Sequence, residues 1–158
     1  MNYIIGVDPG LSGAIAVLGV RGIVLEVADM PIAKVKKGKN EIMAGPLAEI
    51  LREYDAGEVW LESVHAMPGQ GVSSSFSFGD SFGLVKGIAA ALEMPLRLVT
   101  PQAWKKHHGL LRTDKDVSRT LASQLYPKVE LHRKKDIGRA DALLIARYGL
   151  DQTERDAS

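Results

Sequence analysis

Three short apolar segments in the first 28 residues place the strongest constraint on how this chain can fold. They read YIIGVD (residues 3–8), GAIAVL (13–18) and GIVLEVA (22–28), and the turn sequences PGLS and GVRG separate them. Their length, their β-branched residues and the intervening turn residues favour strands over helix. The chain is therefore predicted to open with three consecutive antiparallel strands.

The rest of the chain alternates helical and strand patterns. A polar connector with four lysines (30–42), which we expect to be mobile, comes first. It is followed by a helix within 40–57 that Gly57 ends, a strand (58–63), a loop rich in Gly and Ser (65–83), a helix (81–94), a strand (96–100) and a helix (101–109). A further helix has Thr113 as its N-cap and runs to Pro127, and a last one begins near Gly138. Alternation of this kind implies parallel pairing. We predict an α/β domain over residues 1–150, a mixed five-stranded sheet flanked by helices, and a frayed polar tail over 151–158.

The composition limits the protein classes that remain. A chain of 158 residues with 46% apolar content fits one domain with a proper core. The absence of cysteine excludes a disulfide framework and a thiolate metal site. No apolar run approaches 18 residues and no basic segment precedes the first strand, so neither a membrane span nor a signal peptide is predicted. We expect a cytoplasmic protein.

Basic residues are concentrated in the second half of the chain. Residues 97–147 hold twelve Lys and Arg against five Asp and Glu, although the whole chain carries a net charge of only +1. A local excess of this kind suits a polyanionic partner such as nucleic acid. Solvated helix faces also carry such excesses, so charge alone leaves both interpretations open.

Three acidic residues lie in apolar surroundings, where a solvated surface acid is least expected. Asp8 ends the first strand, Glu62 ends the strand VWLE, and Asp141 lies inside the helical segment RADALLIA. Two of them have a structural alternative, since Asp8 could accept N–H bonds in its turn and Asp141 could cap a helix. If the two strands are neighbours, however, the carboxylates meet at one sheet edge, where divalent cations would make the cluster favourable. Oxygen ligands without Cys or paired His suit Mg²⁺ or Mn²⁺.

The motifs IGVDPG (5–10), VWLES (59–63) and GRADALLIA (138–146), with TPQAWK (100–105) between them, resemble the RuvC-type Holliday junction resolvases of bacteria and their phages. These enzymes belong to the RNase H-like superfamily, and the resemblance covers residues 3–149. It implies an RNase H-like fold and a homodimer that nicks four-way or other branched DNA symmetrically. It also implies two Mg²⁺ ions per active site, which Mn²⁺ can replace, in a two-metal hydrolysis of phosphodiesters.

The resemblance assigns metal-ligand roles to Asp8, Glu62 and Asp141. The family usually has a fourth ligand three residues before the last Asp, and Gly138 stands at that position. Asp136 is the nearest acid, five residues before Asp141. This spacing would place it about 140° around a continuous helix, so it can join only if the helix begins after it. We predict Asp136 as the fourth catalytic ligand, with His132 as an alternative.

The resemblance also suggests DNA-binding and dimer residues. Lys105 and Lys115 match basic positions near the scissile phosphate, and neighbouring bases would extend the track along the backbone. His65 or Phe76 would stack at the junction, whereas Phe82 is expected in the core. The predicted DNA-binding set is Lys105, Lys106, Arg112, Lys115, Arg119, His65 and Phe76. Gly79, Gly83 and Gly87 leave a smooth helix face that fits either packing on the protein's own sheet or the family's dimer interface.

Two other functions stay open at this point. A catalytically silent branched-DNA-binding protein would shift a four-way junction in a gel without cutting it. An ATPase lobe of the actin or sugar-kinase type would hydrolyse nucleotide, but such proteins need two lobes and this chain has room for one.

Overall fold

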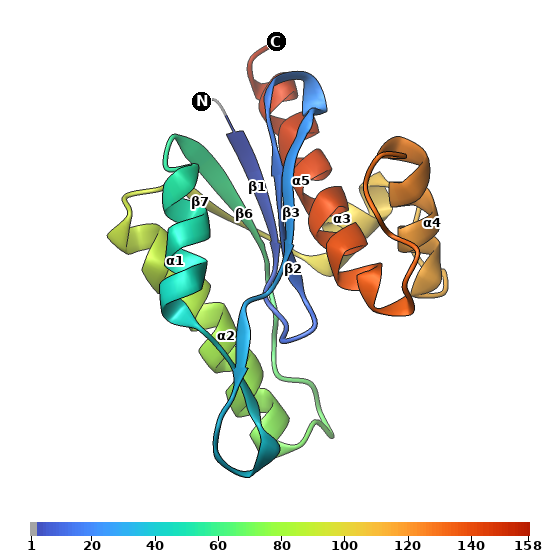
Figure 1. The fold of residues 1–158 in the computed structure, drawn as a ribbon. Coiled ribbons are helices and arrows are strands. Elements are labelled where there is room, and N and C mark those ends of the chain that lie inside the picture. Colours follow the sequence, from blue (N-terminus) through green and yellow to red (C-terminus); the bar gives the residue numbers. More distant parts are fainter. Residues whose placement is uncertain (1–2) are drawn as a thin grey trace.

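The computed structural model describes residues 3–158, and it has one five-stranded sheet at its centre (Figure 1). The strand order is β3-β2-β1-β6-β7. The strands span Tyr3–Asp8 (β1), Ala14–Leu18 (β2), Val24–Asp29 (β3), Gly57–Glu62 (β6) and Leu96–Val99 (β7). The first three pair antiparallel, whereas β6 pairs parallel with β1 and β7 parallel with β6. The predicted meander and mixed sheet are confirmed.

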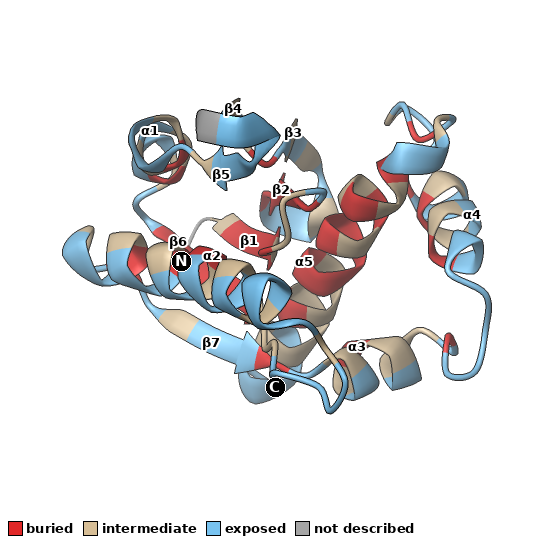
Figure 2. Cartoon of the chain, turned by 90° about the horizontal axis from the view of Figure 1, so that it is seen from below, coloured by how far each residue is buried: buried red, intermediate tan, exposed pale blue. Residues whose placement is uncertain are grey.

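Helices cover both faces of the sheet and bury a separate apolar core on each (Figures 1 and 2). One face carries α1 (Ala44–Glu53) and α2 (Val72–Ala91), and the other carries α3 (Pro101–His107), α4 (Asp116–Leu125) and α5 (Ile137–Asp156). The helix α5 contributes a continuous buried stretch from Ala142 to Ala146 and crosses β1 and β2. No helix within residues 3–158 is long and apolar enough to cross a membrane.

The close packing of α5 on β1 depends on a glycine. A Cβ atom on Gly6 would lie 2.2 Å from the carbonyl oxygen of Ala142 and 2.4 Å from the amide nitrogen of Ala146. The backbone of α5 therefore rests directly on β1, which a side chain at this position would prevent. This contact fixes α5, and Asp141 with it, over the strand that ends at Asp8.

Four parts of the structure differ from the sequence expectation. The lysine-rich connector forms a hairpin of β4 (Ile32–Lys34) and β5 (Asn40–Ile42), because a tight turn with positive φ at Lys37 and Gly38 joins two short strands. Most of the expected Gly/Ser loop is helical, since α2 already begins at Val72. The N-cap of α4 is Lys115 and not Thr113, whose hydroxyl donates to the carbonyl of Leu110. The expected frayed tail continues α5 as far as Asp156.

Candidate active site

The carboxyl ends of two adjacent parallel strands place Asp8 and Glu62 at the same edge of the sheet. The register pairs Val7 of β1 with Leu61 of β6, so the next residue of each strand is one of the two acids. Asp141 reaches this edge from α5, where it is the fifth residue of the helix and so does not cap it. The structure thus brings together three carboxylates that lie far apart in the sequence, as their apolar contexts predicted.

The pKa values of all three carboxyl groups are raised, which indicates that their surroundings disfavour the ionised forms. Burial raises the pKa of Glu62 to about 7, and the charges of Asp8 and Asp141 add to the shift. Burial likewise raises the pKa of Asp141 to about 6, with a further contribution from Asp8. The pKa of Asp8 is also raised by burial, although the Gly10 amide and Lys105 oppose the shift. Desolvated acids that repel one another are stabilised when a cation neutralises them.

Two hydrogen bonds orient the strand-end carboxylates. The indole Nε1–H of Trp104, a fully buried residue of α3, donates to Oε2 of Glu62 at 2.6 Å. The amide of Gly10 donates to Oδ1 of Asp8 at 3.2 Å, which is the turn contact expected if Asp8 were only structural. Each carboxylate keeps one oxygen outside these bonds. The Asp8 turn contact therefore coexists with a role in a site.

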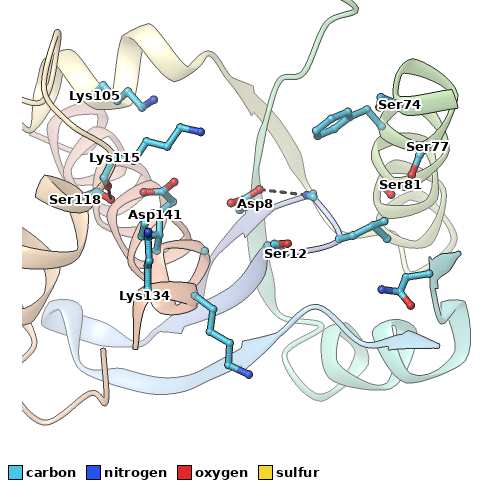
Figure 3. Close-up of a pocket in the computed structure, with 18 of the residues that line it drawn as sticks. Asp8, Ser12, Ser74, Ser77, Ser81, Lys105, Lys115, Ser118, Lys134 and Asp141 are labelled. Atoms are coloured by element: carbon cyan, nitrogen blue, oxygen red, sulfur yellow. Dashed lines mark hydrogen bonds between the residues drawn. The ribbon is translucent and has the colours of Figure 1, made fainter. Parts of the chain in front are cut away.

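Asp8 and Asp141 line a pocket of about 870 Å³ that opens beside the sheet edge (Figure 3). Asp141, Lys105, Lys115 and Lys134 lie on one side, and Ser74, Ser77 and Ser81 of α2 lie on the other. Five lysines and three aspartates line the pocket in all. A negative centre surrounded by cations is suited to a polyanion that approaches bound metal.

The three carboxylates are better suited to hold divalent cations in pairs than to enclose one ion together. No group of three Asp, Glu or His side chains in residues 3–158 is arranged to enclose one ion. Mg²⁺ keeps several waters and is commonly held by one or two carboxylates together with substrate phosphates, so it does not need such a cage. Asp8, Glu62 and Asp141 are the residues that would hold it, because they are oxygen ligands whose charge is otherwise unbalanced.

Asp136, predicted as the fourth ligand, is engaged elsewhere. The helix α5 begins directly after it, as that prediction required, but its carboxylate is buried and bound by the backbone and guanidinium of Arg133 in a capping box. The hydrogen bonds and charge of Arg133 hold the pKa of Asp136 below its usual value. Asp136 is not among the residues that line the pocket. The structure therefore favours a capping role for Asp136 over ligation.

The position of the missing ligand has no space for a side chain. A Cβ atom on Gly138 would lie 2.2 Å from the carbonyl oxygen of Ser12, because the turn between β1 and β2 closes against the first turn of α5. The alternative ligand, His132, is exposed and does not line the pocket. The backbone carbonyl of His132 accepts a bond from Arg119. Neither predicted substitute therefore joins Asp8, Glu62 and Asp141.

The predicted DNA-binding bases divide into three groups. Lys105 and Lys115 line the pocket, whereas Lys106 and Arg112 are exposed outside it. Arg119 has a structural role, because its guanidinium donates hydrogen bonds to Asp116 and to the carbonyls of residues 131 and 132. These bonds join α4 to the segment before α5, so Arg119 has a bracing role that the sequence did not reveal.

The aromatic and glycine predictions concern the exposed face of α2. Phe76 is 78% exposed on this helix, His65 is exposed in the preceding loop, and Phe82 packs against the core as expected. A Cβ atom on Gly79, Gly83 or Gly87 would meet nothing within 4 Å. Packing of these glycines on the protein's own sheet, one of the two explanations considered, is therefore wrong for the single chain.

Several residues of the site were not predicted from the sequence. Trp104 belongs to the TPQAWK motif, but the motif does not reveal its bond to Glu62, because this bond depends on how α3 packs. Lys134 and Lys135 were counted in the basic segment but not assigned to the site, and Lys39 belonged to a connector expected to be mobile. The pocket serines of α2 lay in a segment interpreted as a loop. A helical pattern through SSSFSFGDSFG would have placed these serines on the same face as the buried Val85 and Ala89.

Comparison with solved structures identifies the class of fold. The chain has the RNase H-like fold of the RuvC-type Holliday junction resolvases, in agreement with the resemblance of its motifs. One match is the structure of RuvC from Thermus thermophilus, at 18% identity and a TM-score of 0.70, covering 98% of this chain and 96% of that one. The same enzyme in complex with a Holliday junction substrate matches at 16% identity and a TM-score of 0.67, covering 97% and 96%.

A eukaryotic structure matches less closely. The yeast mitochondrial Holliday junction resolvase matches at 14% identity and a TM-score of 0.52, covering 95% of this chain and 80% of that one. No family model matches the sequence, and no curated protein matches it. At these identities the comparisons establish the fold alone.

Proposed function

We propose that this protein is a Mg²⁺-dependent endonuclease that resolves four-way DNA junctions. The observation that carries the proposal is the meeting of Asp8, Glu62 and Asp141 at one end of β1, with raised pKa values and a rim of lysines. The likeness to a resolvase structure that contains a Holliday junction supports the choice of substrate.

In the proposed reaction, different residues bind the metal ions, orient a ligand and hold the DNA. Two divalent ions, when bound, activate a water and stabilise the leaving oxygen of the phosphodiester. Asp8, Glu62 and Asp141 hold the ions, and Trp104 fixes the orientation of Glu62 through its indole N–H. Lys105 and Lys115 attract the scissile strand and hold its phosphates beside the carboxylates.

The direct test compares a four-way junction with a linear duplex of the same sequence. Purified protein with Mg²⁺ or Mn²⁺ is expected to cut the junction far faster, in paired nicks at symmetric positions, and EDTA is expected to stop the reaction. Equal cutting of both DNAs would contradict junction selectivity.

A silent junction-binding protein is the second candidate, because no ligand occupies position 138 and Asp136 is capped by Arg133. Binding without cutting in either metal would favour that function.

Metal binding is expected to stabilise the protein measurably. At 100 times the dissociation constant, Mn²⁺ or Mg²⁺ should add about 2.7 kcal/mol to the free energy of unfolding and raise Tm by about 5 °C or more. Thermal unfolding followed by circular dichroism measures the shift. In Asp8→Asn the metal-dependent shift should be lost, whereas Tm without metal should rise, because one of three repelling buried charges is gone. An unchanged response to metal in this variant would contradict the assignment of Asp8.

A homodimer through the exposed face of α2 is part of the proposal, because two sites are needed to cut two strands symmetrically. Val72 and Phe76 are exposed on this face beside the glycines. Gly83→Leu should abolish the dimer in sedimentation experiments and leave the monomer folded, since the new side chain meets no neighbour in the single chain. Gly45→Leu, at an equally open position on α1, is the control. A Gly83→Leu protein that remains dimeric would rule out this face.

A further inference from the structure

The helix α2 extends past the end of the sheet, and the face that it turns toward the protein changes character there. Over the sheet this face carries Val85 and Ala89, which are fully buried. Beyond the sheet the same face, at helical spacing, carries Ser81, Ser77 and Ser74, and these residues line the pocket (Figure 3). Ser73, one turn before Ser77, lines it as well.

These serines are unusual on an α-helix that needs only to cover a sheet. Serine is a weaker helix former than alanine, because its hydroxyl competes for backbone hydrogen bonds. On α2 the serines form a wall that carries no charge, since Asp80 and Lys86, the charged residues of the helix, do not line the pocket. The opposite wall is cationic, with Lys105, Lys115 and Lys134 (Figure 3).

Ser81 provides an independent sign that this wall meets a ligand. It is only 4% exposed and lines the pocket, none of the hydrogen bonds found within residues 3–158 involves its hydroxyl, and this hydroxyl is not one of the fully enclosed polar atoms, so it is open to the pocket. A hydroxyl that is open to the pocket and makes no bond within the chain is free to bond to an oxygen atom of a ligand. Serine hydroxyls both donate and accept hydrogen bonds, so they can bind phosphate oxygens and sugar oxygens alike.

We propose that the hydroxyl face of α2, formed by Ser73, Ser74, Ser77 and Ser81, binds the sugar–phosphate backbone of the DNA strand that enters the pocket. This inference rests on the proposed function and adds to it a wall that acts through uncharged hydrogen bonds. The strand lies between two unlike surfaces, in which the lysines supply long-range attraction and the serines supply short-range positioning over Asp8. Neutral contacts on this side avoid drawing the phosphates away from the metal-binding carboxylates.

The salt dependence of DNA binding distinguishes the contribution of the lysines from that of the serines. Each phosphate neutralised by a lysine contributes about 0.7 to 0.9 to the slope of log K against log salt, whereas a neutral hydrogen bond contributes nothing to that slope. In EDTA, the double variant Ser74→Ala/Ser77→Ala should bind a four-way junction about 10-fold more weakly at every salt concentration, with the slope of the wild type. Lys115→Gln should also weaken binding, but it should reduce the slope by about one such increment.

The control is Ser75→Ala, on the same helix but outside the pocket, which should bind like the wild type. Alanine favours helix, so circular dichroism should show that all the serine variants fold. If the wild type binds and the double variant binds equally well, changes the slope, or loses no more affinity than Ser75→Ala, the serine wall is disproved while the proposed function stands. A wild-type protein that does not bind the junction overturns both.

Discussion

Asp8→Asn is expected to reduce the cutting of a four-way junction by about 1,000-fold or more and to leave junction binding intact. Removal of one carboxylate from a metal-binding set removes several kcal/mol of transition-state stabilisation, and each 1.36 kcal/mol is a factor of ten in rate. Asparagine keeps the volume of the side chain and the oxygen that accepts the Gly10 amide, so the turn should be preserved. Binding of DNA to the surrounding lysines does not require the lost charge.

Cleavage rates and gel-shift affinities of the same preparations measure the two effects separately. Asp55→Asn removes an exposed acid away from the pocket and should behave as the wild type in both assays. Rapid cutting by Asp8→Asn would contradict the ligand role. Loss of binding and cutting together would show that Asp8 serves mainly to hold its turn.

The fold was largely predictable because its strands are short, apolar and well separated by turn residues. The same patterns placed Asp8 and Glu62 at the ends of strands, and parallel pairing of β1 with β6 then required them to be neighbours. The β4–β5 hairpin was missed because its four lysines suggested a mobile connector, although the turn at Lys37 and Gly38 gives it a defined shape. The high lysine content of this segment thus concealed the preference of its backbone for a tight hairpin turn.

The first part of α2 was missed for a different reason. Serine and glycine have low helix propensity, so SSSFSFGDSFG resembles a loop when it is considered alone. Packing of Phe82, Val85 and Ala89 against the second core gives the helix its stability, and this tertiary contribution is invisible in the local sequence.

The prediction of Asp136 as fourth ligand did not take into account an interaction between neighbouring residues. Arg133 and Asp136 form a reciprocal cap before α5, with the Arg133 amide donating to Asp136 Oδ2 at 2.8 Å. Charge and spacing suggested Asp136 as a ligand, but the same features suit a cap, and only the fold shows which use prevails. A similar limit applies to Trp104, whose contact with Glu62 joins residues 42 positions apart.

The close approach of α5 to β1 leads to the largest expected effect on stability. Gly6→Ala would place a methyl group within 2.9 Å of three backbone atoms of α5, and a helix backbone cannot yield to it without moving as a whole. We expect the free energy of unfolding to fall by about 3 kcal/mol or more, with Tm lower by roughly 6 °C or more. Urea and thermal unfolding measure the loss.

The same variant tests how the site is assembled, because α5 carries Asp141 to the end of the strand that carries Asp8. A displaced helix should impair cutting of the four-way junction more than binding to it, because Asp141 lies on α5 itself, whereas Lys105 and Lys115 lie outside this helix. Gly45→Ala is the matched control, because a Cβ atom there meets nothing within 4 Å and Tm should be equal or slightly higher. If Gly6→Ala unfolds at the wild-type temperature, α5 does not rest directly on β1, and the proximity of Asp141 to Asp8 loses its structural basis.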